Sequence, residues 1–231
     1  MLFLLQKINA VNDHDSPCQN KMTPLLKISK SIFIVIALTF ASKWAYLHYF
    51  NKKEKKIAPK EIHEVLMFSH GLGELQKSKY SRCVVTQSMD RLLYFVNSPR
   101  YTLDICMYVL TNLDLAQTVL KQHLKGVKVR VIVDADMAYA SGSHIRKLEK
   151  QGIPVRWMKS TNLMHHKFSL VDASSENPAA VPMVIMGSLN WTNQALSGNW
   201  EDVTVTSQRE LVDKYRLEFD RLWVLFKPIV E

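Results

Sequence analysis

Apolar stretches with strand character alternate with amphipathic helical stretches from residue 88 onward, and this alternation limits the fold more than any other feature. The stretch at residues 181–188 is apolar almost throughout, as in strands that are buried on both faces. Residues 112–127 instead place leucine, alanine and valine at helical spacing on one face. The alternation predicts an α/β layered domain with a mixed central sheet.

The expected elements follow one another without an internal repeat. We expect helices at residues 88–98, 112–127, 143–152 and 209–226, and strands at residues 101–110, 127–134, 153–158, 166–172 and 181–188. Asn112 is a candidate N-cap for the helix at residues 112–127, and Gly126 is a stop signal at the end of the same helix. Residues 69–82 are polar and contain glycine, which indicates a loop.

A separate apolar stretch covers residues 31–50, long enough to cross a bilayer as a helix. Lys43 interrupts it, but a lysine stem can extend toward an interface. Four lysines follow, which places the C-terminal side in the cytosol: Lys52, Lys53, Lys55 and Lys56. A cleaved signal peptide and a buried core helix fit less well, because no small-residue cleavage site is present and lysines flank the stretch. Such an anchor suits the outer mitochondrial membrane, and the endoplasmic reticulum stays open as an alternative.

Composition divides the chain in the same way. We expect four parts: a disordered N-terminus at residues 1–30, a transmembrane anchor at 31–50, a basic linker at 51–60 and a catalytic domain at 61–231. The formal charge is +9, but residues 1–60 carry 10 Lys and 3 Asp or Glu, which leaves only +2 for the rest. The bulk charge of residues 61–231 is therefore not that of a nucleic-acid-binding domain. The three cysteines (Cys18, Cys83 and Cys106) lack paired spacing, which favours a reducing compartment.

Polar side chains with phosphate-binding chemistry gather at the ends of two predicted strands. His165 and Lys167 are two residues apart and share one face of a strand, whereas His166 points to the other face. Ser188 and Asn190 follow an apolar strand, at the position where open α/β sheets bind ligands. A cation, a hydroxyl and an amide together suit the non-bridging oxygens of a phosphate.

Two carboxylates accompany this group. We expect Glu201 to accept the Nδ1–H of His165, which would leave Nε2 free for attack. Asp172 lies seven residues after His165 and therefore points to the opposite face of the strand, so we expect it to fix the local turn. The spacing H-x-K-x4-D alone is a weak indicator, because it also occurs by chance in other chains. Its combination with G-S-x-N downstream is a specific pattern. The sequence therefore predicts phosphodiester chemistry.

The spacing of His165, Lys167 and Asp172, followed by Gly187-Ser188-Leu189-Asn190 and Glu201, resembles the signature of the phospholipase D superfamily. The single motif and the anchor narrow the resemblance to its mitochondrial branch, called Zucchini in insects, over about residues 60–226. The resemblance implies a phospholipase D-like α/β/α sandwich with one HKD motif per chain. It carries catalytic roles onto His165, Lys167, Asp172 and Glu201, and substrate phosphate binding onto Lys167, Ser188 and Asn190.

The family mechanism implies that His165 attacks the phosphodiester and forms a covalent phosphohistidine, which water then cleaves. It requires no metal and no cofactor. Because a second histidine must act as general acid and the chain has one motif, we expect a homodimer. Relatives carry a zinc-binding insertion of three cysteines and a histidine. This chain offers only His63, His70 and Cys83 in the corresponding stretch, so we expect no metal.

The resemblance implies a hydrolase in the outer mitochondrial membrane, with a single span and its catalytic domain facing the cytosol. The favoured function is a single-strand-specific endoribonuclease in PIWI-interacting RNA biogenesis, with single-stranded RNA and piRNA-pathway proteins as partners. The alternative is a phospholipase D that hydrolyses cardiolipin at the mitochondrial surface. An inert scaffold conflicts with the complete motif. The residues alone do not separate RNA from lipid.

Overall fold

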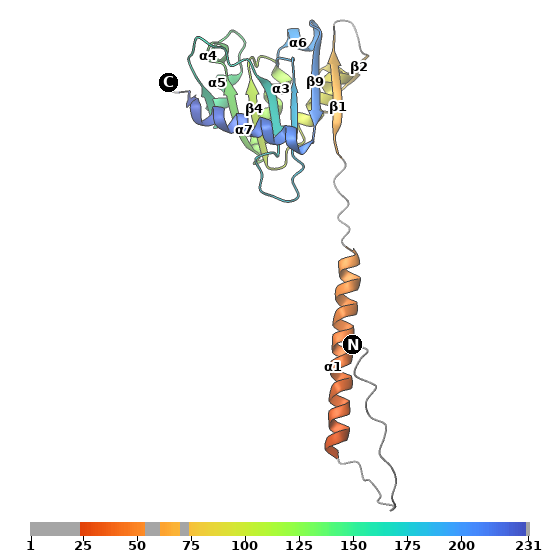
Figure 1. Ribbon diagram of the computed structural model, residues 1–231. Coiled ribbons are helices and arrows are strands. Elements are labelled where there is room, and N and C mark those ends of the chain that lie inside the picture. Colours follow the sequence, from red (N-terminus) through yellow and green to blue (C-terminus); the bar gives the residue numbers. More distant parts are fainter. Residues whose placement is uncertain (1–23, 54–60, 70–73, 230–231) are drawn as a thin grey trace, which may run out of the picture. The chain divides into compact units, whose positions relative to one another are not determined.

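The computed structural model describes residues 24–53, 61–69 and 74–229. The chain divides into two compact units, Met1–Ala58 and Pro59–Glu231, and each is described by itself. The first contains helix α1 (Pro24–Lys53), shown in Figure 1. Its segment Ser31–Tyr49 has a mean hydropathy of 1.4 and no buried share, so its length and composition suit a membrane crossing. The helix begins at Pro24, inside the stretch predicted to be disordered; residues 1–23 lie outside the described part.

The second unit is built on a mixed sheet of eight strands in the order β1-β9-β8-β7-β4-β5-β6-β10 (Figure 1). Its strands are β1 (His63–Phe68), β4 (Thr102–Met107), β5 (Lys128–Val133), β6 (Val155–Trp157), β7 (Lys167–Val171), β8 (Met183–Gly187), β9 (Glu201–Thr206) and β10 (Lys227–Pro228). Strands β4, β5 and β6 pair in parallel, and every other pair in this sheet is antiparallel. A small second sheet contains β2 (Leu75–Lys77) and β3 (Val84–Thr86). The predicted mixed sheet is confirmed.

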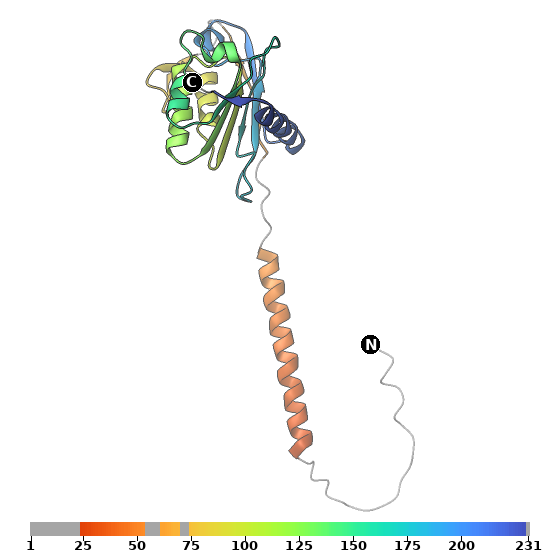
Figure 2. The same cartoon turned by 90° about the vertical axis from the view of Figure 1, so that its left-hand side faces the viewer.

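Helices cover both faces of the large sheet. They are α2 (Gln87–Val96), α3 (Leu113–Leu124), α4 (Ala135–Ala138), α5 (Ile145–Lys150), α6 (Asn193–Ser197) and α7 (Arg209–Leu225). Figure 2 shows α7 on one face and α2 and α3 on the other. Asn112 caps α3 by accepting the Leu115 N–H, and Gly126 beyond the helix has φ of +91°. The predicted N-cap and stop signal of this helix are therefore present.

Side chains of one strand enter two different cores. Leu103, Ile105 and Met107 of β4 are buried in the core beneath α2 and α3. Cys106 points the other way, into the core that Phe168 and residues of α7 complete. Because β4 is covered on both sides, all six of its residues are buried, and its charged side chain, Asp104, requires a partner inside the fold. Each fully buried large side chain stabilises the fold by about 1.5–3 kcal/mol.

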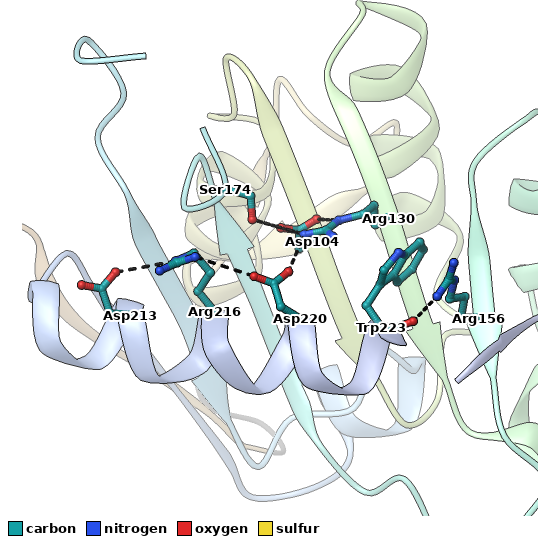
Figure 3. A network of polar contacts seen from close by, with 8 residues as sticks. All are labelled: Asp104, Arg130, Arg156, Ser174, Asp213, Arg216, Asp220 and Trp223. Atoms are coloured by element: carbon teal, nitrogen blue, oxygen red, sulfur yellow. Dashed lines mark hydrogen bonds and ion pairs between the residues drawn. The ribbon is translucent and has the colours of Figure 1, made fainter. Parts of the chain in front are cut away.

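A charged network joins α7 to the sheet (Figure 3). The Asp104 carboxylate of β4 is buried and accepts from Arg130 Nε at 2.7 Å and from Arg130 Nη2 at 2.9 Å. The same Nη2 donates to Asp220 of α7 at 3.2 Å, and the guanidinium lies 4.8 Å from the centre of the Phe219 ring. The bidentate pair thus compensates a buried charge. The contacts of Arg130 with Asp220 and Phe219 join α7 to β4 and β5.

Strand direction brings distant parts of the sequence to one edge of the sheet. Strand β8 runs parallel to β4, and β7 and β9 run opposite to both. The C-terminal ends of β4 and β8 therefore meet the N-terminal ends of β7 and β9. We call this the polar edge. Strands β4 and β8 end there at Met107 and Gly187, and strands β7 and β9 begin there at Lys167 and Glu201.

Candidate active site

His165 and Lys167 are in contact at the start of β7, on the polar edge. Lys167 Nζ lies 3.2 Å from His165 Nδ1 and 3.4 Å from Nε2, and it donates to the His165 carbonyl oxygen at 2.9 Å. The imidazole is exposed and the lysine is half-buried. His166 turns toward α7, where its Nε2 lies 3.4 Å from Glu218 Oε1. The pair thus leaves an imidazole and a cation accessible on the same side.

Asp134 holds the backbone that leads into His165. Its buried carboxylate accepts the Met164 N–H at 3.0 Å and also caps α4, with 3.1 Å to Asp136 N. The segment that follows β5 therefore contacts the backbone directly before His165. Asp134 limits the movement of His165 through this hydrogen bond.

Ser188 follows β8 and lies beside Glu201. Its hydroxyl donates to Glu201 Oε2 at 2.5 Å and accepts from Asp202 N at 3.1 Å. A Cβ at Gly187 would lie 2.1 Å from the Asp202 carbonyl oxygen, so only glycine allows β8 and β9 to approach this closely here. Asn190 Oδ1 is buried and has no hydrogen-bond partner in the part of the chain that the structure describes. This amide oxygen is therefore a hydrogen-bond acceptor without a donor among the described residues, in the segment that follows the C-terminal end of β8.

The loop that carries Ser188 and Asn190 is anchored to the segment after β4. Trp191 is 2% exposed and packs in the core beneath α2 and α3. Its carbonyl oxygen accepts the N–H groups of Thr111 at 2.9 Å and Asn112 at 2.8 Å. The buried indole and these two hydrogen bonds therefore fix the loop to the interior of the domain.

Glu201 differs from its expectation in its hydrogen-bond partners. It is the first residue of β9, and its second carboxylate oxygen accepts from Asn199 Nδ2 at 2.9 Å. The expected hydrogen bond with His165 is wrong: the carboxylate is taken by Ser188 and Asn199 instead. The reason is pairing of β8 with β9, which places the serine hydroxyl closest to this carboxylate.

The cation at the site has a perturbed acidity. Partial burial lowers the pKa of Lys167 below its ordinary value, because desolvation disfavours the charged form, and the negative charge of Glu201 opposes the shift. A partly desolvated ammonium is suited to bind an anionic phosphate. Glu201 thus contributes electrostatically to Lys167 although it does not contact His165.

Asp172 lies at the other end of β7, away from His165 and Lys167. It is 3% exposed, has φ of +52°, and its carboxylate accepts backbone N–H groups of Arg100 at 3.1 Å, Tyr101 at 2.8 Å and Thr102 at 3.0 Å. The structure therefore separates it from the other predicted site residues. These hydrogen bonds agree with the expectation that Asp172 fixes the local turn, and they do not support the catalytic role that the resemblance carried onto it.

Residues considered for zinc do not form a cluster. The His63 ring contacts Thr206 and Glu61, and Cys83 is exposed. His70 lies outside the described residues. Among residues that the structure describes, no group of three or more histidine, cysteine or acidic side chains could hold a metal ion.

Tyr108, the first residue after β4, was not singled out from the sequence. Its ring centre lies 4.6 Å from that of His165, and Lys167 Nζ lies 5.2 Å from its centre. The available signal was its position directly after a buried strand, at the edge where ligands bind in such sheets. That signal was insufficient, because no residue spacing indicated that β4 pairs with β7.

Comparison with known proteins decides the family. The family model described as "Cardiolipin synthase, PLD-like domain" matches residues 92–223, more than half of the chain and all of the predicted site residues. The chain belongs to the phospholipase D superfamily. Its predicted superfamily and fold are therefore confirmed.

Curated relatives share a name that specifies both a compartment and a substrate. A "Mitochondrial cardiolipin hydrolase" from Chlamydomonas reinhardtii is 42% identical over 140 residues, covering 61% of this chain and 59% of that protein. One of the same name from Drosophila melanogaster is 30% identical over 230 residues, covering 86% of this chain and 90% of that protein. The phospholipase D superfamily member thus spans about three fifths of one relative and most of the other. The prediction of a superfamily hydrolase agrees with these relatives.

Solved structures with low identity share the fold. The phospholipase D family member Nuc from Salmonella typhimurium has a TM-score of 0.58 at 18% identity, covering 74% of this chain and 100% of that one. NucT from Helicobacter pylori has a TM-score of 0.58 at 19% identity, with the same coverage. These likenesses support the α/β architecture with its mixed sheet.

Proposed function

We propose that the protein is a phosphodiesterase that hydrolyses cardiolipin with His165 as the nucleophile. The observation that carries the proposal is the contact between His165 and Lys167 on the polar edge, the edge at which β8 ends and leads into Ser188 and Asn190. Imidazole and ammonium groups at this separation can act on the same phosphorus atom and its oxygens. The substrate follows from the relatives named above.

The reaction proceeds in two displacements. A nitrogen of His165 attacks phosphorus, an N–P bond forms, and the P–O bond to the leaving glycerol oxygen breaks as a general acid protonates that oxygen. Water then attacks the same phosphorus, its proton returns to the acid–base group, and the N–P bond breaks. The products are phosphatidic acid and phosphatidylglycerol, and His165 is regenerated.

The remaining polar groups stabilise the charge that develops on the phosphate. Lys167 and the Asn190 amide NH₂ bind non-bridging oxygens as phosphorus becomes five-coordinate. Ser188 joins them as a hydroxyl donor, and Glu201, which accepts that hydroxyl before substrate binds, holds it in place. The negative charge of Glu201 also raises the pKa of Lys167, against the effect of burial.

The general acid comes from a second copy of the chain. His166 cannot serve, because its ring lies against Phe168 and next to Glu218 on the α7 face. One motif per chain therefore supports a homodimer in which His165 of the partner subunit protonates the leaving group. The active unit would contain one phosphate site made by two imidazoles.

The anchor and the substrate suggest a common location. Helix α1 contains a segment that suits one membrane crossing, and lysines follow it in the sequence. Together with the compartment in the relatives' name, these features support a single-pass protein of the outer mitochondrial membrane with its catalytic unit in the cytosol. Cardiolipin would then be reached from the membrane that holds the enzyme.

Full-length protein in liposomes that contain cardiolipin tests the proposal. We expect phosphatidic acid and phosphatidylglycerol to appear in equal amounts, and we expect His165→Asn to abolish both. His166→Asn is the matched control, because it removes the adjacent imidazole from the opposite face and should retain activity. Absence of both products from the folded wild type, or wild-type turnover by His165→Asn, would contradict the proposal.

Labelled single-stranded RNA is the second arm of the same experiment. The endoribonuclease activity that the sequence favoured, and the piRNA-pathway partners that go with it, remain predictions, since the relatives' names refer to cardiolipin. His165-dependent cleavage of RNA without any lipid turnover would replace cardiolipin by RNA as the substrate. Intact RNA together with lipid turnover would support the present proposal.

A further inference from the structure

Tyr108 is the side chain that touches both members of the candidate catalytic pair. Its ring lies 4.6 Å from the His165 ring, with a tilt of 51°, and the Lys167 ammonium lies 5.2 Å from its centre. The tyrosine is half-buried, whereas His165 is exposed. The imidazole therefore has the tyrosine ring beside it on the protein side and the Lys167 ammonium at its nitrogens.

The backbone fixes this wall. Tyr108 N donates to the His166 carbonyl oxygen at 3.0 Å, which extends the β4–β7 ladder one step beyond the pair of Met107 with Lys167. Tyr108 therefore cannot move relative to the start of β7 without breaking a backbone hydrogen bond. Its hydroxyl makes no hydrogen bond to any residue within the described ranges, so the contact with the pair belongs to the ring.

The electrostatic setting makes an aromatic ring useful here. Lys167 lies within 3.4 Å of both ring nitrogens of His165, so a positive charge on the histidine is opposed by the ammonium. Glu201 on β9, which accepts from Ser188, is a further charge that acts on Lys167, and it favours the ammonium. The face of an aromatic ring is negative and attracts cations without forming a competing hydrogen bond.

We propose that Tyr108 is a positioning residue. Its ring keeps the His165 imidazole and the Lys167 ammonium in the relative orientation that attack on phosphorus requires. The role rests on the proposed phosphodiesterase function but not on the identity of the lipid. The ring supports the imidazole in one orientation and stabilises the ammonium that binds the phosphate. The hydroxyl takes no part.

Three full-length variants test this role: Tyr108→Leu, Tyr108→Phe and Tyr139→Leu. The probe is bis(p-nitrophenyl) phosphate, a soluble diester that is neither lipid nor RNA. Loss of one cation–π contact predicts that Tyr108→Leu lowers kcat about 2- to 30-fold with little change in KM. Tyr108→Phe should stay within about twofold, because the ring remains. Tyr139, an exposed tyrosine that packs on Trp157, is the matched control and should not change kcat.

A titration separates positioning from a structural role. Removing the ring removes a contact that favours the ammonium, so Tyr108→Leu should lower the pKa of Lys167 further, and Tyr108→Phe should not. NMR of protein labelled at the lysine ε-carbon measures this without any substrate, and the thermal midpoint verifies folding. Equal losses in the Phe and Leu variants, or an unchanged kcat and an unchanged Lys167 titration in Tyr108→Leu, would overturn the proposal. Normal diester turnover without cardiolipin turnover would instead contradict only the lipid assignment.

Discussion

Replacement of Asp172 tests whether its carboxylate stabilises the fold or takes part in catalysis. In Asp172→Ala, the backbone N–H groups of Arg100, Tyr101 and Thr102 lose the acceptor that they share. Water can reach Arg100, which is exposed, but not Thr102, which is buried. At about 1–3 kcal/mol for each donor left unsatisfied in the interior, and less for an exposed one, the free energy of unfolding should fall by about 3–5 kcal/mol.

Backbone conformation refines the expectation. Asp172 has φ of +52°, which asparagine tolerates better than alanine does. Asp172→Asn also keeps one oxygen acceptor and should therefore lose less stability than Asp172→Ala. Glu176→Ala is the matched control, because it removes an exposed carboxylate four residues after Asp172 and should change stability by less than about 0.5 kcal/mol.

Thermal unfolding of the full-length protein in detergent, followed by circular dichroism, is the assay. For a domain of this size the loss in Asp172→Ala corresponds to a fall in Tm of about 6–20 °C. Below the new Tm, kcat per folded molecule should stay within about threefold of wild type, because Asp172 touches no reacting group. A variant with wild-type Tm and a kcat reduced by orders of magnitude would refute the structural role and restore the catalytic one.

Three further substitutions test other parts of the account. His165→Asn should lower kcat by at least about 10⁴-fold and leave Tm unchanged, measured by diester turnover and circular dichroism, since the side chain is exposed. Glu201→Gln removes the charge that opposes the burial effect on Lys167; the pKa of Lys167 should fall further, and the alkaline limb of the pH–rate profile should move to lower pH. Asp104→Ala leaves Arg130 without its bidentate partner and should cost about 3–5 kcal/mol in urea unfolding; an unchanged midpoint would contradict the network of Figure 3.

The fold was predictable where local signals and burial agree. The run at residues 181–188 is apolar because both faces of β8 are covered, and the N-cap at Asn112 requires only the residues that follow it. Strands β1 and β9 were missed because they lie at or next to the edge of the sheet and are partly exposed. Their strand character depends on pairing His63–Phe68 with Glu201–Thr206, across more than 130 residues of chain.

The candidate site was predictable as a set of residues but less so as a set of contacts. Strand parity assigned His165 and Lys167 to one side and His166 to the other, because the period of a strand is fixed. The partner of Glu201 depends on how β8 pairs with β9, and Tyr108 reaches His165 only because β4 pairs with β7. Such pairings are tertiary and leave no periodic trace in either strand.

Mixed dimers test the central claim, that two copies of His165 act on one phosphate. Wild-type chains would be mixed with increasing proportions of His165→Asn, subunits allowed to exchange, and cardiolipin hydrolysis measured per wild-type and variant chain together. If both imidazoles are required, turnover follows the square of the wild-type fraction, so an equal mixture retains about one quarter of full activity. Turnover that falls in direct proportion, to about one half, would show that one His165 suffices and would contradict the account.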